Sequence, residues 1–287
     1  SPASTAVEIS LGGLTVRCRE APVTVAVCGG SFDVRHEDRR RTPWTVVTLR
    51  PEDRLVVAAG TWGSWCTLAV AGRLVATSWM GSTSTHVRTG VGGGSIRSGD
   101  ELVVEAAVAV PHLDGPIDIP RRAEPTPDLR VVLGPQLDCF TAAAVEMFRS
   151  EPFAVTAAYD RMGVRFAGPT LEVVDALGIP TTPVVRGSIQ VSGDGAATLL
   201  QADHQTTGGY PRIATVIGPD AERATQLRAG DTVRFHPIDP HAASDAARSD
   251  AALVERLLGE LANRPGVRSQ RLLGANLVGG VVDAASP

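Results

Sequence analysis

The chain has 287 residues, of which 43% are hydrophobic and 20% charged. It therefore has an ordinary globular composition, with room for two domains or one large one. Its net charge of −4 argues against a nucleic-acid partner, because such partners usually meet a basic surface. No apolar run reaches the roughly 18 residues of a membrane helix. Since the sequence starts at Ser1 and shows no signal peptide, we expect a cytoplasmic protein whose true N-terminus is missing.

Side-chain composition excludes several mechanisms. All 27 basic residues are arginine, which excludes a Schiff-base lysine, a Ser-Lys dyad, a P-loop lysine and a biotinylated lysine in this chain. The four cysteines, Cys18, Cys28, Cys66 and Cys139, are scattered, so we interpret them as buried thiols and predict no metal site. Thirty glycines, twenty prolines and only 4% aromatics favour a strand-and-turn fold with an aliphatic core.

Short apolar runs rich in Val and Thr predict strands through the first 110 residues. The runs lie at 7–11, 14–18, 23–28, 45–49, 54–59, 66–71 and 101–108. The charged stretch 34–44 between two of them is interpreted as a solvated hairpin tip. Residues 109–128 contain five prolines and no periodic pattern, which is typical of a linker.

Strands resume beyond this linker. They are predicted at 129–134, 153–157, 164–166, 184–191, 197–202, 212–218 and 232–235. Helices are predicted at 140–148, where Thr141 is a candidate N-cap, at 220–227 and at 250–263. The pattern predicts a mainly β protein with β domains at 1–110 and 129–240, a linker at 111–128, and a C-terminal helix and tail at 241–287.

A phrase of the form apolar-Arg-x-x-Asp-x-apolar occurs at 49–55, 96–102 and 227–233. Each copy leads into a predicted strand, and its aspartate can accept hydrogen bonds from nearby backbone N–H groups to form a turn. The second and third copies lie about one domain length apart, which favours two related β domains in tandem.

Three polar segments that contain glycine lie between predicted strands, at 82–93, 160–165 and 203–211. Glycine lets the backbone approach a ligand closely. Arg88 and Arg161 can hold a carboxylate through paired hydrogen bonds, and Gln205 can both donate to and accept from an amide group. Each segment also has the composition of an ordinary loop, and the residues alone leave both interpretations open.

Eight motifs run in order along the chain up to Phe235. They are Glu8-Ile-Ser-Leu-Gly-Gly13, residues 82–93, Ser98-Gly-Asp100, Gly134-Pro-Gln136, Asp160-Arg-Met-Gly163, Gly187-Ser-Ile-Gln-Val191, Gln205-Thr-Thr-Gly-Gly-Tyr-Pro211 and Leu227-Arg-Ala-Gly-Asp231. Together they resemble the family variously called the 5-oxoprolinase C subunit, biotin-dependent carboxyltransferase or allophanate hydrolase subunit 2.

The resemblance implies two tandem cyclophilin-like β-barrel domains with a few short helices. It also implies a smaller partner, of the type of the 5-oxoprolinase B subunit or allophanate hydrolase subunit 1. With a third subunit, such an assembly opens 5-oxoproline to glutamate using ATP. Homologous domains of urea carboxylase transfer the carboxyl group of carboxybiotin to urea, and a regulatory member antagonises an inhibitor of a sporulation kinase.

The sequence departs from the family pattern in two places. Relatives begin with an additional segment containing Ser-Gly-Ala-Met-Asp, which we expect to be missing here. They also tend to have Arg and Asp at the positions of Thr83 and His86.

We therefore predict a subunit of a hydrolase complex that acts on an amide or lactam C–N bond, with 5-oxoprolinase as the preferred activity. The alternatives are biotin-dependent carboxyl transfer to urea or a similar amide, and a regulatory protein without catalysis. The cofactor expected for the complex is ATP, not necessarily bound by this chain, or biotin under the first alternative. The predicted catalytic residues, which polarise a carbonyl or act as a base, are Gln205, Thr206, Thr207 and Asp203. The predicted substrate-binding residues are Arg88, Gly92, Gly93, Arg161, Met162, Gly163, Gly208, Gly209, Tyr210 and Pro211.

Overall fold

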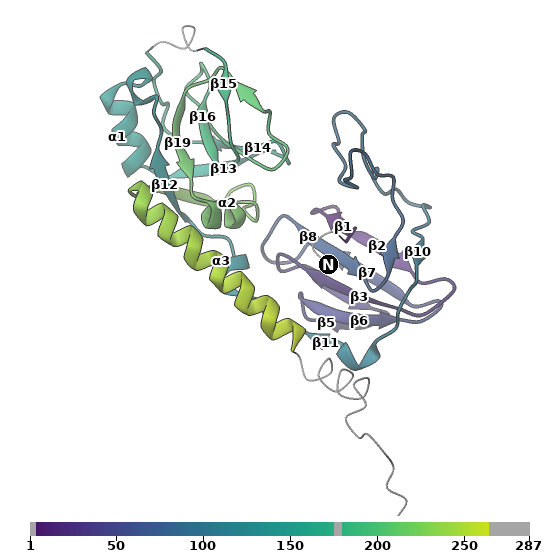
Figure 1. Ribbon diagram of the computed structural model, residues 1–287. Helices are drawn as coiled ribbons and strands as arrows, with labels where there is room; N and C mark the ends of the chain where they lie inside the picture. Colours follow the sequence, from purple (N-terminus) through teal and green to yellow (C-terminus); the bar gives the residue numbers. More distant parts are fainter. Residues whose placement is uncertain (1–3, 175–179, 264–287) are drawn as a thin grey trace, which may run out of the picture.

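The structure is a computed structural model that describes residues 4–174 and 180–263. It is mainly β, as predicted, and Figure 1 shows two bodies of strands with one long helix, α3 (Pro240–Ala262), running beside both. In the described residues, the buried apolar side chains form two separate clusters, one in each half of the chain. The predicted domain limits remain our proposal, and the predicted tail beyond residue 263 lies outside the described residues.

The first half consists of two main antiparallel sheets and the small two-stranded sheet of β9 and β10. Its strands are β1 Val7–Ile9, β2 Leu14–Arg17, β3 Val23–Cys28, β4 Asp33–His36, β5 Arg39–Arg41, β6 Thr45–Leu49, β7 Arg54–Ala58, β8 Cys66–Val70, β9 Arg73–Leu74, β10 Val104–Glu105 and β11 Gly115–Pro116. The main sheets have the orders β1-β8-β3-β6-β11 and β2-β7-β4-β5. Val27 and Leu68 from the first sheet and Leu55 from the second belong to one buried cluster. Burial of one face of each sheet therefore holds this half together.

Most of the strands predicted in this half are confirmed to within two residues, and the charged stretch 34–44 contains the hairpin of β4 and β5. The run 101–108 is the exception, since it forms only the short strand β10, which pairs with β9. Ala106, with a φ of 49°, turns the chain directly after β10. Before β10 the chain forms a long excursion, residues 75–103, closed at its base by a hydrogen bond from Val75 N to Val103 O of 2.9 Å. We call this excursion the arm.

The second half is a closed barrel. Its strands are β12 Asp128–Leu133, β13 Phe153–Tyr159, β14 Gly163–Ala167, β16 Ser188–Val191, β17 Ala197–Leu200, β19 Arg212–Val216 and β20 Thr232–Pro237, in the order β12-β19-β16-β17-β14-β13-β20. The barrel closes because β12 pairs antiparallel with β19 and parallel with β20. Phe148 and Phe235 stack in its core with ring centroids 4.6 Å apart. Phe153 and Phe166 also contact the ring of Phe235, and aliphatic side chains make up most of the remaining core.

A separate two-stranded sheet lies outside the barrel, and the continuous strand that the sequence predicts at 184–191 forms only in its second part. Gly187 has a φ of 89°, which favours glycine and breaks the strand, so the barrel strand β16 begins only at Ser188. The residues before it form β15 (Thr182–Pro183), which pairs with β18 (Thr207–Gly208). We call β15 and β18 the flap.

The helices α1 (Ala142–Ser150), α2 (Gly218–Ala224) and α3 correspond to the three predicted ones. Thr141 caps α1 as predicted, accepting a hydrogen bond of 3.2 Å from Ala144 N. The start of α3 is a correction, because the helix begins at Pro240 rather than at Asp250. Asp239 caps it through the backbone N–H groups of His241 and Ala242. Its first turns are rich in alanine but lack an apolar stripe, so periodicity alone missed them. No helix in the described parts of the chain combines the length and the apolar character that crossing a membrane requires.

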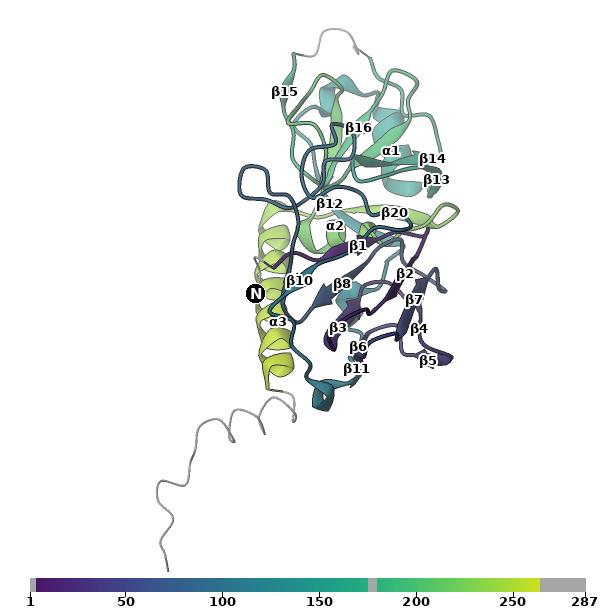
Figure 2. The ribbon, with the colours of Figure 1, turned by 90° about the vertical axis from the view of Figure 1, so that its right-hand side faces the viewer.

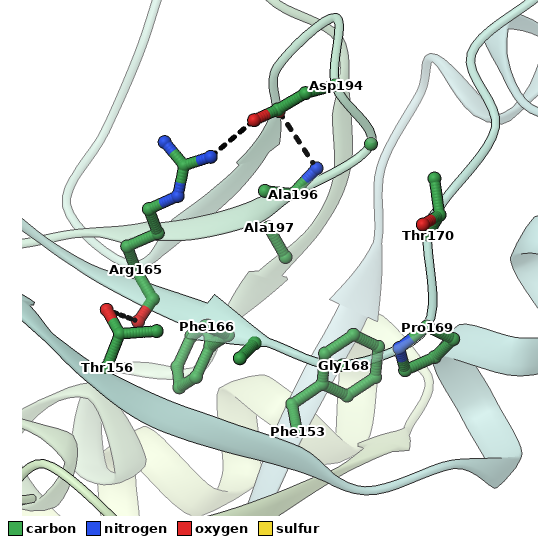
Figure 3. Close-up of a pocket in the computed structure, with 12 residues that line it drawn as sticks. Phe153, Thr156, Arg165, Phe166, Gly168, Pro169, Thr170, Asp194, Ala196 and Ala197 are labelled. Carbon is green, nitrogen blue, oxygen red and sulfur yellow. Dashed lines mark hydrogen bonds and ion pairs between the residues drawn. The ribbon is translucent and has the colours of Figure 1, made fainter.

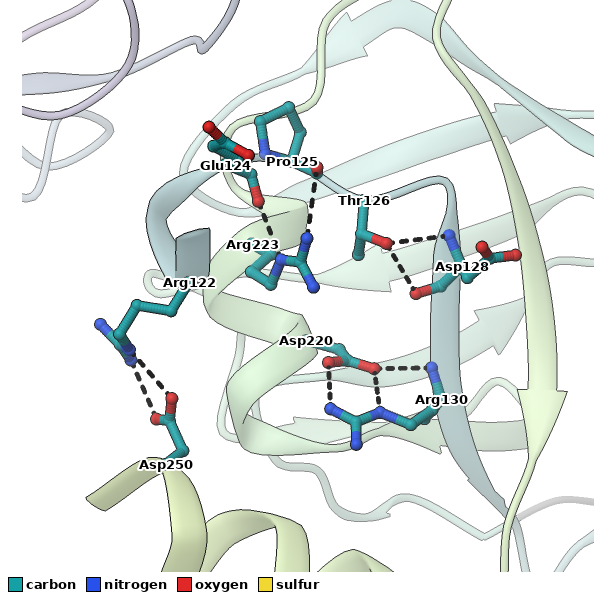
Figure 4. A network of polar contacts seen from close by, with 9 residues as sticks. All are labelled: Arg122, Glu124, Pro125, Thr126, Asp128, Arg130, Asp220, Arg223 and Asp250. Atoms are coloured by element: carbon teal, nitrogen blue, oxygen red, sulfur yellow. Dashed lines mark hydrogen bonds and ion pairs between the residues drawn. The ribbon is translucent and has the colours of Figure 1, made fainter. Parts of the chain in front are cut away.

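The predicted linker is held to the second half by arginine contacts (Figure 4). It contains the 3-10 turns η1 (Pro111–Leu113) and η2 (Arg121–Ala123), and a third such turn, η3 (Leu137–Cys139), precedes α1. Arg122 forms a two-pronged pair with Asp250 of α3, both contacts being 2.9 Å. Arg223 of α2 donates to the carbonyl of Glu124 at 2.8 Å. Because a two-pronged guanidinium contact fixes orientation as well as distance, the linker is a bound segment rather than a flexible one.

The two halves are joined by a cluster of hydrogen bonds around Arg228. Its Nε and Nη2 donate to Gly63 O at 2.8 and 2.6 Å, and its Nη1 donates to Gly60 O at 2.8 Å. Beside it, Gln226 Oε1 accepts from Ser64 N at 3.0 Å, and Ser64 Oγ donates to Leu227 O at 2.6 Å. The loop at 60–65 of the first half is therefore clasped by the segment that follows α2 in the second.

The repeated phrase in the sequence forms the same turn each time, as predicted. Asp53, Asp100 and Asp231 each accept a hydrogen bond of 2.7–2.8 Å from the backbone N–H of the arginine three residues earlier. Each aspartate N–H also donates to that arginine's carbonyl, at 3.0–3.1 Å. The third copy differs in that its arginine, Arg228, reaches across to the other half.

Replacing Arg228 by alanine is expected to destabilise the protein by about 2–3 kcal/mol, because charge-assisted hydrogen bonds to backbone carbonyls are lost. The matched control is Arg50→Ala. Arg50 occupies the same place in the first copy of the turn, and its exposed side chain makes no hydrogen bond within the described residues. We expect the control to change stability by less than about 0.5 kcal/mol. Urea unfolding followed by circular dichroism measures both, and equal midpoints for the two variants would contradict the assignment.

Candidate functional site

A pocket of about 400 Å³ lies on the outer face of the second barrel. In β14, Val164 and Phe166 point into the core and are buried, whereas Arg165 between them is half-exposed and faces outward. The same alternation places Gln190 of β16 and Thr198 of β17 on the outer face. The pocket is lined by Ala158, Asp160, Met162, Gly163, Arg165, Gln190, Ser192, Thr198, Leu200, Gln205 and Tyr210.

Strand register sets the floor of this pocket. Thr198 is paired with Arg165 on one side and with Gln190 on the other, so these three side chains form a row across β14, β17 and β16. Leu200, paired with Gly163, adds an apolar position beside the row. The floor therefore offers a guanidinium, a hydroxyl and a carboxamide within one plane of the sheet.

Two glutamine carboxamides meet at one side of the pocket. Gln205 Nε2 donates to Gln190 Oε1 at 2.9 Å. Gln190 is 4% exposed, and its own Nε2 is buried with no hydrogen-bond partner among the described residues. A buried amide donor without a partner costs roughly 1–3 kcal/mol, a cost that an acceptor reaching Nε2 would offset.

The turn 160–163 forms one wall of the pocket. Asp160 Oδ1 accepts from the backbone N–H of Met162 at 2.7 Å and of Gly163 at 3.1 Å, which closes a tight turn between β13 and β14. This turn places Met162 and Gly163, both predicted as binding residues, at the pocket.

The segment 203–211 forms a second wall, which adjoins the turn 160–163. Gln205 and Tyr210 line the pocket, and Tyr210 is 53% exposed. Thr206, Thr207, Gly208 and Gly209 belong to the flap or adjoin it and do not line the pocket. Pro211 is buried, and its carbonyl accepts from Val191 N. The structure thus brings together one predicted catalytic residue and three predicted binding residues, and places the other predicted residues of this segment beside them.

Arg161 and Asp203 are paired with each other rather than directed into the pocket. Arg161 donates to Asp203 from Nε at 2.8 Å and from Nη2 at 3.0 Å, and its Nη1 contacts Glu8 of β1 at 2.5 Å. The hydrogen bonds to Asp203, and then those to Glu8, raise the pKa of Arg161. The groups that the sequence analysis assigned to a substrate anion and to base catalysis are therefore engaged with each other.

The third predicted segment lies in the arm, which rises from the first half toward the second barrel (Figures 1 and 2). Arg88 is exposed on it and has no hydrogen bond or ion pair within the described residues. Gly92 and Gly93 have a local role, since a Cβ would lie 1.9 Å from Ser84 O at Gly92 and 2.6 Å from Thr83 O at Gly93. They permit two backbone segments of the arm to touch, and none of these three residues lines the pocket.

Gln190 is the residue that the site prediction missed, although it belongs to one of the recognised motifs. The available signal is a polar residue inside β16, Ser-Ile-Gln-Val, in which all four residues are buried. A buried carboxamide on a barrel strand indicates either an internal hydrogen bond or a ligand contact.

A second pocket, of about 270 Å³, lies near the far end of β14 (Figure 3). Its floor includes Phe153 and Phe166, and its rim includes Asp194, which is paired with Arg165. Hydrogen bonds, first from the Ser192 hydroxyl and then from Ala196 N, lower the pKa of Asp194 to about 2. Because this carboxylate is already satisfied and the pocket contains none of the predicted residues, we assign it no role.

Comparison with known proteins gives one family and several relatives. Residues 1–237 match the family model described as carboxyltransferase domain, subdomain A and B. The chain is 28% identical to the 5-oxoprolinase C subunit of Haemophilus influenzae, over 88% of this chain and 81% of that protein. It is equally similar, at 28%, to the 5-oxoprolinase C subunit of Escherichia coli, over 90% and 83% of the two chains.

Two solved structures have a similar fold. The urea carboxylase of Kluyveromyces lactis gives a TM-score of 0.76 at 24% identity, over 88% of this chain and 24% of that one. TTHA0988 gives a TM-score of 0.69 at 28% identity, over 80% and 45%. This chain therefore corresponds to less than half of each of these two structures.

Adding a methyl group at residue 208 is expected to displace the Gln190 amide. A Cβ at Gly208 would lie 2.4 Å from Gln190 Nε2, whereas at Gly209 the nearest atom is Thr181 Oγ1 at 3.6 Å. Gly208→Ala should therefore break the hydrogen bond between Gln190 and Gln205, and Gly209→Ala should leave it intact. In protein labelled with ¹⁵N-glutamine, the side-chain amide signals of both residues should shift in the first variant and stay in place in the second. Unchanged signals in Gly208→Ala would contradict the described packing.

Proposed function

Because this chain belongs to the carboxyltransferase domain A and B family, as its motifs indicated, we propose that it is a subunit of a heteromeric, ATP-dependent enzyme acting on an amide or lactam C–N bond. The preferred reaction is the opening of 5-oxoproline to glutamate. The similarity to the C subunits of two bacterial 5-oxoprolinases, over nearly the whole length of both chains, supports this choice.

The observation that carries the proposal is the pair of carboxamides at the pocket. Gln190 Nε2 is a buried donor without a partner, and Gln205 Oε1 is an acceptor that makes no hydrogen bond within the described residues. A lactam presents one carbonyl acceptor and one N–H donor side by side, so it complements this pair. Two neutral partners suit a neutral group, because an unpaired charge at such a site would be costly to desolvate.

The proposed chemistry is polarisation of the scissile carbonyl by donors that are already in place. Gln190 and Gln205 hold the C–N group, and we assign further donation to the hydroxyls of Thr207, in the flap strand β18, and of Thr206 directly before it. Removing one donor of this kind from an enzyme typically costs 10²–10³ in kcat. For the carboxylate of the substrate we propose Arg88 of the arm. Its guanidinium is exposed and unpaired within the described residues and lies outside the pocket lining, so it would meet the part of the substrate that projects from the pocket.

We assign ATP to the assembled complex rather than to this chain. The chain has no lysine, and therefore no Walker A lysine to contact nucleotide phosphates. In the carboxyltransferase alternative, biotin would have to be carried by another chain or domain for the same reason. The carboxamide pair also fits urea, which is why this alternative is kept.

For the partner, we propose a protein of the 5-oxoprolinase B type that docks on the arm. The relatives are named as one lettered subunit of 5-oxoprolinase. On the arm, Trp79 is 60% exposed, Met80 91% and Val87 67%, and exposed Trp, Met and Arg are typical of protein interfaces. Residues 75–99 contain no acidic side chain, so the partner surface should be apolar with an acidic rim.

Alanine at Trp79 is expected to weaken the complex with this B-type partner by at least tenfold in Kd, because a buried interface tryptophan commonly contributes 2 kcal/mol or more. Isothermal titration calorimetry with the two purified proteins measures this. Val185→Ala serves as control, since Val185 is 57% exposed and belongs to the second half rather than to the arm. Equal Kd values for the Trp79→Ala and Val185→Ala variants would show that the arm is not part of the interface.

Gln205→Ala and Thr206→Val are each expected to lower kcat/KM of the complete complex by about 10²-fold or more without changing the fold, because both side chains are exposed, Gln205 at the pocket and Thr206 directly before the flap strand β18. The assay is ATP-dependent release of glutamate from 5-oxoproline. Ser150→Ala, at the end of α1, is the control. No turnover by the complete wild-type complex would overturn the 5-oxoprolinase proposal. Full activity of both variants would show that the segment 203–211 is an ordinary loop without a role in catalysis.

A further inference from the structure

We propose that Arg161 is a positioning residue, and that the bridge Glu8–Arg161–Asp203 holds both walls of the pocket in register with the first half of the chain. Its kinetic consequence rests on the proposed function, whereas its structural consequence does not.

The bridge joins three segments that are distant in the sequence. Arg161 belongs to the turn 160–163, Asp203 begins the segment 203–211, and Glu8 is in the edge strand β1 of the first half. Arg161 grips Asp203 with two parallel hydrogen bonds and reaches Glu8 with its remaining Nη1. The planar guanidinium can make both contacts at once because its donors point in different, fixed directions.

The bridge is partly shielded from water, which distinguishes it from an ordinary surface ion pair. The Arg161 side chain is 25% exposed, that of Asp203 17% and that of Glu8 44%. By contrast, Arg256 and Glu260 on α3 are 69% and 65% exposed and 3.9 Å apart. Exposed pairs of that kind contribute little to stability, whereas shielded two-pronged pairs fix a geometry.

Backbone hydrogen bonds extend the contact between the two walls. Asp203 N donates to Arg161 O at 2.7 Å, and Gln201 N donates to Met162 O at 3.0 Å. The pocket residues Asp160 and Met162 flank Arg161 directly, and Gln205 is two residues from Asp203. The side chain of Arg161 does not itself line the pocket, so its effect on a ligand is exerted through the positions of these neighbours.

Glu8 extends this control to the first half. Its neighbours Val7 and Ile9 are 7% and 3% exposed and anchor β1 in the core of that half. Because β1 is anchored in this way, the contact between Glu8 and Arg161 ties the position of the pocket walls to that of the first half. Removing the charge of Glu8 should break the contact that ties the two pocket walls to β1, while the ion pair between Arg161 and Asp203 stays in place.

The test compares Glu8→Gln with Glu260→Gln, which makes the same chemical change at the exposed pair on α3. Amide hydrogen exchange, measured by mass spectrometry on the purified full chain, should rise several-fold in residues 201–208 of Glu8→Gln and remain at the wild-type rate in Glu260→Gln. Arg161→Lys should exchange faster still in this segment, because an ammonium group cannot grip Asp203 and Glu8 in the same plane. Unchanged exchange in 201–208, or a uniform rise over the whole chain, would overturn the proposal.

A kinetic measurement on the complete complex adds a second readout. Glu8→Gln should raise KM for 5-oxoproline about five- to tenfold and change kcat less than twofold, as expected when the ground state and the transition state lose the same binding interaction. A fall in kcat with KM unchanged would overturn the positioning role. If the wild-type complex does not turn over 5-oxoproline, the hydrogen-exchange comparison still decides the inference, so the two failures are distinguishable.

Discussion

The hydrogen bonds of Arg228 fix how the two halves of this chain meet, and the candidate site depends on that placement. One guanidinium satisfies two carbonyl oxygens of the loop at 60–65, while its own backbone N–H is held by Asp231. The contact requires close approach, since a Cβ at Gly63 would lie 2.4 Å from the Cα of Gly30 and 2.8 Å from Gln226 Oε1. With this loop clasped, the first half has a defined position, and Glu8 can reach Arg161 across the junction. The pocket is built by the second half, but its walls are tied to the first.

Along each barrel strand, side chains alternate between the inner face, which stabilises the fold, and the outer face, which carries the pocket. Side chains on the inner face, such as Val164, Ile189 and Leu199, are fully or almost fully buried and supply the apolar area that stabilises the fold. Outward side chains on the same strands are free to differ, and here they are a guanidinium, a hydroxyl and a carboxamide. The flap then covers part of this outer face and leaves Gln190 Nε2 buried without a partner among the described residues, although Oε1 of the same amide accepts from Gln205. A cost of about 1–3 kcal/mol for such a donor is tolerable beside so large a core, and it leaves the site ready to accept a carbonyl.

Features of the fold and of the candidate site were predictable from the sequence where the interacting residues are close together in the chain. Most strands were predicted well because the alternation of apolar and polar residues is visible within a few neighbouring residues. The Arg-x-x-Asp turns and the Thr141 cap were predictable because each spans only three residues. Gln205, Met162, Gly163 and Tyr210 were placed near the pocket through motif resemblance rather than through periodicity. The partners of Arg161 were not predictable, because Glu8 lies 153 residues away in the sequence and Asp203 lies 42 away. Gln190 was missed for the same reason, since its importance comes from the flap that folds over it. The early start of α3 was missed because alanine favours a helix without marking a face.

Because the chain contains no lysine, all of its cationic side chains other than histidine are arginines, and several of them hold segments together. Arg122, Arg130, Arg161 and Arg228 each use the planar fork to hold a carboxylate or a backbone carbonyl through two or more hydrogen bonds. A lysine ammonium could neutralise the same charges, but it could not fix the angle between the segments that meet there. Most of the shielded cationic groups are thereby committed to architecture, and Arg165 at the pocket is itself paired with Asp194. Apart from Arg165 and the turn-forming Asp160, what remains at the pocket for recognition is neutral: two carboxamides, the hydroxyls of Ser192 and Thr198, and an exposed tyrosine. Such a set discriminates by hydrogen-bond pattern rather than by charge, and this argues for an uncharged amide, lactam or ureido group as the part of the substrate held there.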